Sequence, residues 1–312
     1  MRRLLTLLLL CATPAMAEPP RIVADIAPVQ SLVATVMAGA GTPELLIPAG
    51  VSPHDLSLKP SQARALGHAD LVVWMGPEMS PWLGRVLEAN GAAQMPLIRV
   101  PGTTVLAFRE NALFGDDHDS HTEGGHTEDG HDHGHGGIDP HAWLDPDNAV
   151  VWMQALAERL AQMDPEHADL YRANATAGVA DLRALTRKMT DQLAPARSIG
   201  LIAFHDAFQY LEARFGLHMV GSVTPGDDSD PGPARISALR AAAQAGEVVC
   251  AFAEPQFNPG LLEAVTEDAG LPVAVLDPLG ATIEPGAELY AAMMSGMADT
   301  IATCVAQAGK GE

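Results

Sequence analysis

The feature that most constrains this chain is an alternation of predicted strands and helices that occurs twice. Short runs rich in valine and isoleucine alternate with amphipathic stretches of helical length. In the first half we predict strands at residues 22–26, 44–48, 71–76 and 95–100, and helices at 28–38, 61–69 and 81–90. In the second half we predict strands at 198–204, 219–223, 248–252 and 273–276, and helices at 206–215, 234–245, 259–269 and 287–306. This order predicts an α/β fold of two lobes with mainly parallel sheets.

A single long helix is predicted between the two lobes. Asp164 is a good N-cap, Pro165 suits the first helical position, and Glu166 favours a helix N-terminus. Apolar side chains then recur at helical spacing as far as about residue 192, before Pro195. A helix of this length would extend about 40 Å, which is enough to cross a domain. Because a continuous helix offers no loop residues for a hinge, we expect it to limit movement of the lobes.

The first residues have the pattern of a secretory signal peptide. Arg2 and Arg3 precede a short apolar run, and Ala15-Met16-Ala17 forms a cleavage site between small residues. The run is too short to span a bilayer. Lipidation at Cys11 is the less favoured alternative, because the residue before it is not small. We expect a soluble mature protein, residues 18–312, exported to the periplasm and without a later apolar run of membrane-spanning length.

A histidine-rich segment gives the first indication of metal binding. The chain has a formal net charge of −21, which disfavours nucleic acid as a partner and favours cations. Segment 116–137 is acidic and rich in glycine, with too few apolar residues to pack, so we expect a mobile loop. Imidazole and carboxylate groups together suit divalent metals, above all zinc. Weak, exchanging metal binding is predicted there, the alternative being a solvated insertion. The histidines concerned are His118, His121, His126, His131, His133 and His135.

Three other histidines are predicted at the edge where open α/β sheets bind their ligands: His54, His141 and His205. Two belong to the first lobe and one to the second, so a shared metal would lie in the cleft between the lobes. Three neutral imidazoles with a carboxylate or a water form a tetrahedral zinc site, and Asp277 at another strand end is the candidate fourth ligand. Each histidine could alternatively be a hydrogen-bonded structural residue.

The remaining polar residues near these motifs receive structural interpretations. His68, His167 and His218 are predicted to be structural or on the surface, and Glu254 is interpreted as organising the turn at Pro255. The ring nitrogens of the ligand histidines that do not bind metal need hydrogen-bond acceptors. Asp55, Asp206 and backbone carbonyls are the candidates, and this choice stays open. The two cysteines of the mature chain, Cys250 and Cys304, are a disulfide candidate in an oxidising compartment, with buried free thiols as the alternative.

Several stretches together carry a family resemblance. They are SPHDLSLKPSQ, ADLVVWMGPEM, the histidine- and acid-rich insertion, DPHAWLDP, FHDAFQYLEARFGL, FAEPQFNP and LDPLG, spread from about residue 22 to 306. With these stretches the chain resembles the ZnuA-type periplasmic zinc-binding proteins of bacterial ABC uptake transporters, within the cluster A-I metal-binding receptors. The resemblance implies two α/β lobes joined by one long rigid helix, with the metal site in the cleft between lobes.

The resemblance also implies roles for individual residues. His54, His141 and His205 would be the zinc ligands, and a histidine at position 205 favours zinc because manganese-binding receptors of the wider cluster have a carboxylate there. Pro53 stands where some zinc-binding members have a glutamate, which leaves Asp277 or water as the fourth ligand. A disulfide in the second lobe fits the two cysteines. The charged loop is associated in the family with additional, weaker zinc binding.

The resulting hypothesis is a high-affinity zinc receptor rather than an enzyme. It would deliver Zn²⁺ to an inner-membrane ABC permease with its cytoplasmic ATPase, and act as a monomer. The alternatives are a periplasmic zinc buffer or metallochaperone, an adhesin and a manganese-type receptor. A zinc hydrolase is disfavoured because the sequence lacks a His-Glu-x-x-His motif. The expected organisation is a signal peptide 1–17, an N-terminal lobe 18–163 that includes the loop 116–137, a linker helix 164–193 and a C-terminal lobe 194–312.

Overall fold

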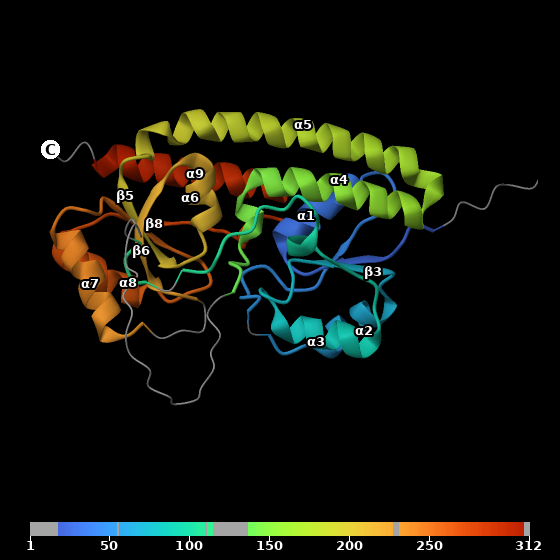
Figure 1. Cartoon of the computed structure of the whole chain (residues 1–312), viewed down its shortest axis with the longest axis horizontal. Helices are drawn as coiled ribbons and strands as arrows, with labels where there is room; N and C mark the ends of the chain where they lie inside the picture. The colour runs from blue at the N-terminus through green and yellow to red at the C-terminus, as the bar shows by residue number, and fades with distance from the viewer. Residues whose placement is uncertain (1–17, 55, 110, 115–136, 227–230, 309–312) are drawn as a thin grey trace, which may run out of the picture.

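The structure is a computed structural model that describes residues 18–54, 56–109, 111–114, 137–226 and 231–308 (Figure 1). Within these ranges the chain forms two parallel β-sheets with helices on both faces, as the alternating pattern predicts. The predicted signal peptide lies outside the described residues. The same is true of the six histidines of segment 116–137.

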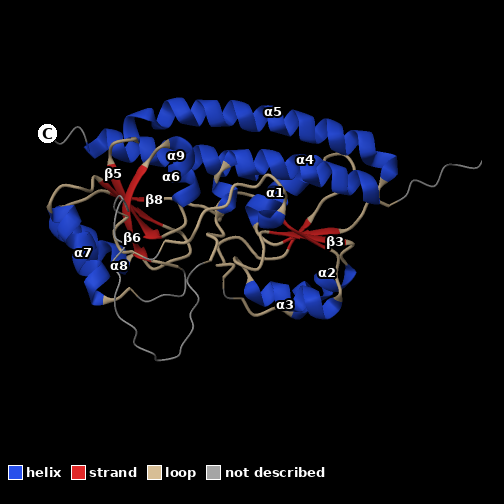
Figure 2. Ribbon diagram, in the orientation of Figure 1, coloured by secondary structure: helices blue, strands red, loops and turns tan. Residues whose placement is uncertain are grey.

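The first sheet is built from strands of the N-terminal half, with the helices that connect them. Its elements are β1 (Ile22–Ala24), α1 (Ala27–Val36), β2 (Glu44–Leu45), α2 (Pro60–His68), β3 (Leu71–Trp74), α3 (Pro81–Asn90) and β4 (Gln94–Pro96). The strand order is β2-β1-β3-β4, with every neighbouring pair parallel. All four residues of β3 are buried, because α1 lies on one side of the sheet and α2 and α3 on the other (Figure 2). The predicted strand 95–100 is wrong beyond Pro96, since Leu97–Arg99 forms a 3₁₀ turn.

The second sheet repeats this plan in the C-terminal half. Its elements are β5 (Gly200–His205), α6 (Gln209–Phe215), β6 (His218–Thr224), α7 (Pro233–Gln244), β7 (Cys250–Ala253), α8 (Gly260–Thr266), β8 (Val273–Val275) and α9 (Leu289–Ala308). The strand order is β6-β5-β7-β8, again parallel throughout. The carboxyl ends of β5 and β7 therefore lie side by side, which matters for the site described below.

Two antiparallel helices connect the sheets. The first, α4 (Pro146–Met163), was not predicted, although Asp145 caps it by accepting a hydrogen bond from the Asp147 amide at 2.9 Å. The second, α5 (Ala168–Leu193), is the predicted long helix, but it begins after a 3₁₀ turn at Pro165–His167 rather than at Asp164. It runs above both sheets along the length of the molecule (Figure 1).

The lobes are joined by more than this helix, because they share one hydrophobic core. That core contains Val72 of the first sheet and Phe252 of the second, connected through buried residues of α4, α5 and α9. A smaller, separate core lies under α7 and α8. Moving one lobe against the other would expose the shared apolar surface to water, which is unfavourable. The packing therefore restricts movement of the lobes beyond what a linker helix alone would do.

Helix α9 differs from one expectation and confirms another. Among the described residues it is the one helix long and apolar enough, by length and composition alone, to cross a membrane, whereas we expected no such run. Its side chains Met293, Met297 and Ile301 are nevertheless buried in the shared core. The predicted disulfide is present and joins Cys304 of α9 to Cys250 of β7. Helix α9 is thus fastened to the second sheet.

The chain that precedes the histidine-rich insertion crosses to the second lobe. Leu113 forms an antiparallel bridge with Gly221, and the Phe114 amide donates to the Val220 carbonyl at 2.8 Å. Gly221 is required there, because a Cβ atom on it would lie 2.2 Å from the Ala112 carbonyl oxygen. This segment covers the exposed edge of β6, which would otherwise present unpaired backbone groups.

Candidate metal site

His205 is the last residue of β5 and is held by a carboxylate from the neighbouring strand. Its ring Nδ1 lies 2.6 Å from Glu254 Oε1, and its backbone amide donates to the same oxygen at 3.2 Å. Glu254 directly follows β7, and both residues are buried. Our interpretation of Glu254 as organising the turn at Pro255 missed this contact, although its other carboxylate oxygen accepts from Gln256 in that turn at 3.1 Å. The order of strands in the sheet explains why, because it brings the ends of β5 and β7 together.

His141 has the same arrangement, built from a local turn. Its ring Nδ1 lies 2.7 Å from Asp139 Oδ1, and its backbone amide donates to that oxygen at 3.0 Å. Both residues are buried, and the 3₁₀ turn Ala142–Leu144 follows. Asp139 was not among the candidate acceptors. Its position two residues before the histidine, in DPHAWLDP, was the available signal.

The two histidines face each other through their other ring nitrogens, with Nε2 of His141 3.4 Å from Nε2 of His205. A carboxylate at Nδ1 favours the tautomer that carries its proton on Nδ1, which leaves a lone pair on each Nε2. Two lone pairs in this position repel unless a proton or a cation lies between them. Two imidazole ligands of one tetrahedral zinc, at about 2.0–2.1 Å from the metal, have nitrogens about 3.3–3.4 Å apart. The observed spacing therefore suits a pair of ligands on one zinc ion.

Aromatic rings flank this pair. Trp143 lies beside His141 with ring centroids 5.3 Å apart, and Phe257 meets the edge of His205 at 5.2 Å. Phe257 also stacks on Phe204 at 4.8 Å. Apolar walls of this kind limit the access of water to the paired rings.

The third predicted ligand, His54, lies next to the pair but on irregular backbone. Its ring centroid is 5.5 Å from that of His141, and its amide donates to Ser52 Oγ at 3.3 Å. The preceding carbonyl, of Pro53, accepts from Ser80 Oγ and Trp82 Nε1, each at 2.9 Å, which ties this segment to the start of α3. In the described ranges, no three His, Cys, Asp or Glu side chains converge tightly enough to hold a metal ion as they stand.

The candidate fourth ligand, Asp277, follows β8 and is occupied with its own turn. Its Oδ1 accepts from the Leu279 amide at 3.2 Å and its Oδ2 from the Thr282 amide at 3.4 Å. Among the described residues, no hydrogen bond joins its carboxylate to the three histidines. Its role as a ligand stays a prediction.

Asp206, one of the candidate acceptors, binds an arginine instead. Arg109 Nε donates to Asp206 Oδ2 at 3.0 Å, and Arg109 Nη1 donates to Glu212 Oε2 at 2.7 Å. The guanidinium also lies 3.6 Å from the centre of the Phe114 ring. Burial works against the charge of Arg109, but the two carboxylates outweigh it and raise its pKa. This cluster fastens the chain before the insertion to the residue that follows His205.

The described residues that follow the histidine-rich insertion lead into the same site. Ala107 forms an antiparallel bridge with Ile138, and the Phe108 amide donates to the Gly137 carbonyl at 3.0 Å. The next residue, Asp139, is the carboxylate that holds His141. The chain that follows the insertion therefore leads directly to the paired histidines.

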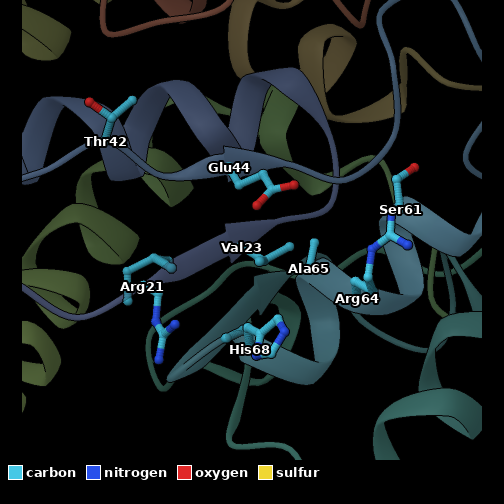
Figure 3. A pocket seen from close by; sticks show the side chains of 10 residues that line it. Arg21, Val23, Thr42, Glu44, Ser61, Arg64, Ala65 and His68 are labelled. Atoms are coloured by element: carbon cyan, nitrogen blue, oxygen red, sulfur yellow. The ribbon is translucent and has the colours of Figure 1, made fainter.

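A separate cavity of about 470 Å³ lies at the opposite end of the first sheet (Figure 3). Figure 3 shows His68 there with Arg21, Arg64 and Glu44, near the start of β1. The three histidines lie beyond the carboxyl ends of the strands, so this cavity is distinct from the candidate metal site. His68 is exposed in it, in keeping with its predicted surface position.

Comparisons with known proteins agree with the family resemblance that the sequence motifs indicate. A family model described as "ZnuA: Zinc-uptake complex component A periplasmic" matches residues 22–304. Proteins named "High-affinity zinc uptake system protein ZnuA" are similar over nearly their whole length. The one from Paracoccus denitrificans is 39% identical, with 94% of each chain covered, and the one from Yersinia pestis is 32% identical, with 95% of each covered.

Solved structures share the fold. A ZnuA deletion mutant crystallised with zinc has a TM-score of 0.75 at 24% identity, covering 92% of this chain and 98% of that one. The protein FpvC of Pseudomonas aeruginosa, in complex with Mn²⁺, has a TM-score of 0.75 at 23% identity, covering 94% and 100%. The family match spans most of the chain, and its members are periplasmic uptake components rather than enzymes. The chain therefore belongs to the ZnuA family of periplasmic zinc-uptake complex components.

Proposed function

We propose that this protein captures Zn²⁺ in the periplasm with high affinity and hands it to an inner-membrane ABC permease driven by a cytoplasmic ATPase. The observation that carries the proposal is the 3.4 Å spacing between Nε2 of His141 and Nε2 of His205. Each ring has a buried carboxylate behind it, as in carboxylate–histidine–zinc sites. Family membership supports zinc as the cargo.

In this proposal, His141 and His205 form the prepared half of the site, and His54 is the third ligand. Completing a three-histidine site requires a local adjustment of the irregular segment that carries His54. The fourth position is taken by Asp277 or by water. Three imidazoles favour zinc over manganese, which prefers more oxygen ligands. The histidines of segment 116–137 would supply additional, weaker sites.

The proposal includes the organisation of the chain. Residues 1–17 would be a signal peptide, and the mature protein would consist of the lobes 18–163 and 194–312 with the connecting helix 164–193. We propose that it acts as a monomer, because the metal would be enclosed by the two lobes of one chain. A zinc buffer, a metallochaperone, an adhesin or a manganese-type receptor would share the site and differ in its recipient or metal.

Titration calorimetry of metal-free protein with Zn²⁺ tests the proposal. We expect one tight site in the mature protein, lost in His205→Ala and retained when residues 116–136 are deleted. The deletion spares Gly137, whose carbonyl accepts from Phe108. His218→Ala, which removes an exposed histidine at the start of β6, is the matched control and should bind zinc as the parent does. Loss of the tight site in the deletion variant, with retention in His205→Ala, would overturn the assignment.

The recipient is tested in cells. A strain that lacks this protein should fail to grow when zinc is chelated and should recover with the parent gene but not with the His205→Ala gene. Recovery with added manganese instead of zinc would indicate a manganese-type receptor. Recovery that does not need the permease would indicate a buffer or a metallochaperone.

A further inference from the structure

The carboxylates behind the paired histidines are themselves held by glutamines. Glu254 uses Oε1 for His205, and its Oε2 accepts from Gln256 Nε2 at 3.1 Å. Asp139 uses Oδ1 for His141, and its Oδ2 accepts from Gln209 at 2.9 Å when the Gln209 amide nitrogen faces its two acceptors. The second acceptor of Gln209 is the Ala107 carbonyl, at 3.0 Å. The site thus has two hydrogen-bonded series of the same kind, each leading from a histidine to a carboxylate to a glutamine.

A glutamine in this position restricts how the carboxylate can turn. A carboxylate held through one oxygen can rotate about its last side-chain bond and carry its histidine partner with it. A hydrogen bond to the second oxygen removes that freedom and fixes the plane of the group. A ligand ring is oriented by the acceptor at its other nitrogen, so a fixed carboxylate also fixes the direction of the Nε2 lone pair.

We propose that Gln209 and Gln256 are positioning residues for zinc binding, acting on His141 through Asp139 and on His205 through Glu254. This inference rests on the proposed function, because it takes the two histidines as zinc ligands. It assigns to the glutamines a share of the zinc affinity without direct contact with the metal.

The two glutamines differ in their separation in the sequence from the carboxylates that they contact. Gln256 is two residues from Glu254, so this contact is made within one loop after β7. Gln209 is the first residue of α6 in the second lobe, whereas Asp139 precedes α4 on the side of the first. Tyr210 strengthens the latter contact, because its hydroxyl donates to the Asp139 carbonyl at 2.8 Å and accepts from the Leu106 amide at 2.9 Å. The contact of Gln209 with Asp139 therefore depends on the packing of the second lobe, whereas that of Gln256 with Glu254 lies within one loop.

The test compares Gln256→Leu and Gln209→Leu with the parent protein, using Zn²⁺ and a competing chelator to measure Kd. Each substitution should raise Kd about three- to tenfold, at or below the lower end of the effect of losing a direct partner of a ligand histidine. Gln30→Leu is the matched control. Gln30 is a buried glutamine that donates to a backbone carbonyl, that of Pro43 at 3.2 Å, and it has no part in the site. Its substitution should leave Kd unchanged.

Two further readouts separate positioning from a general loss of structure. In zinc-loaded protein labelled with ¹⁵N-histidine, Gln256→Leu should shift the Nδ1–H resonance of His205 and leave that of His141 in place, with the reverse for Gln209→Leu. In addition, the double variant Gln256→Leu with Glu254→Gln should have a Kd less than about twofold above that of Glu254→Gln alone, because the carboxylate through which Gln256 acts is gone. Gln209→Leu should behave likewise in Asp139→Asn.

The outcomes also distinguish this inference from the proposed function. Unchanged Kd in both glutamine variants, or effects that multiply fully with those of the carboxylate variants, would overturn the positioning role while leaving the zinc site intact. Tight zinc binding by His205→Ala would instead overturn the site itself. Gln256 lies on a half-exposed loop, so Gln256→Leu carries the test if Gln209→Leu does not fold.

Discussion

The paired histidines and His54 are held by the fold in two different ways. His141 and His205 are buried, and each is locked by a carboxylate that accepts from both its ring and its backbone amide. His54 is half-buried on a segment without regular structure, anchored through the carbonyl before it. The difference teaches that the fold fixes two of the proposed ligands in advance and places the third on a loop. If all three bind zinc as proposed, this division would combine a rigid pair with a ligand that can move when the metal enters or leaves.

The largest effect is expected for His205→Ala. About 10–16 kcal/mol of zinc binding shared among four ligands corresponds to roughly 2.5–4 kcal/mol for each. This share corresponds to a rise in Kd of about a hundredfold to a thousandfold. Loss of the imidazole also leaves the buried Glu254 without its main partner, so we expect a rise of about a thousandfold, at the upper end. Chelator competition would measure this change. A rise in Kd smaller than that caused by His54→Ala would contradict the proposed difference between the carboxylate-held pair and His54 on its loop.

His54→Ala should have the next largest effect. Zinc loses one ligand, but water can reach the half-exposed position and take its place, so Kd should rise about a hundredfold. We also expect zinc to dissociate faster, as stopped-flow release into an excess of chelator would show. An effect equal to that of His205→Ala would mean that the loop is as strictly organised as the pair.

Glu254→Gln should raise Kd about tenfold, in the range found for direct partners of ligand histidines. The glutamine can still accept a hydrogen bond from His205 Nδ1, but it lacks the charge that strengthens the lone pair on Nε2. Asp139→Asn should behave in the same way through His141. Competition titrations of both variants sharpen the comparison, because they measure how much the buried carboxylates contribute to zinc binding by the paired histidines. If both variants bind zinc as the parent does, the buried carboxylates serve only the fold.

Arg109→Ala should have the smallest effect on zinc and the largest on stability. It leaves the buried Asp206 without its cation, which costs about 3 kcal/mol of unfolding free energy. The raised pKa of Arg109 means that its guanidinium stays charged throughout the neutral range. Burial raises the pKa of Asp206, so the loss of stability should become smaller as the pH falls and this carboxylate takes up a proton. Urea unfolding would measure it, and Kd for zinc should change less than about threefold. A change larger than that of Glu254→Gln would place Arg109 in the metal site.

The fold could be predicted to a large extent, because it rests on periodic patterns. Runs such as LVVW of β3 are apolar throughout and need cover on both faces, which a parallel sheet between helices provides. Helix α4 was not predicted, although Asp145-Pro146 carries the signal of an N-cap residue followed by a proline at the first helical position. Element ends differed by a few residues, as at Pro96, where a strand gives way to a turn.

The partners of the histidines could not be predicted in the same way. Glu254 meets His205 because β7 is the neighbour of β5, and strand order is a long-range property that no local pattern encodes. Gln209 meets Asp139 only because the two lobes pack together. Asp206 was a candidate acceptor because it directly follows His205 in the sequence. Its carboxylate instead accepts a hydrogen bond from Arg109.

By itself, the sequence determined the class of fold, the cysteine pair, the family and the three histidines beyond the strand ends. These follow from composition, spacing and motifs, which are local in the chain. Only the tertiary structure decided which carboxylates and glutamines stand behind His141 and His205, and that their Nε2 atoms face each other at 3.4 Å. The physical reason is that metal affinity depends on the direction of a lone pair. That direction is set by groups far apart in the chain, which only packing brings into contact.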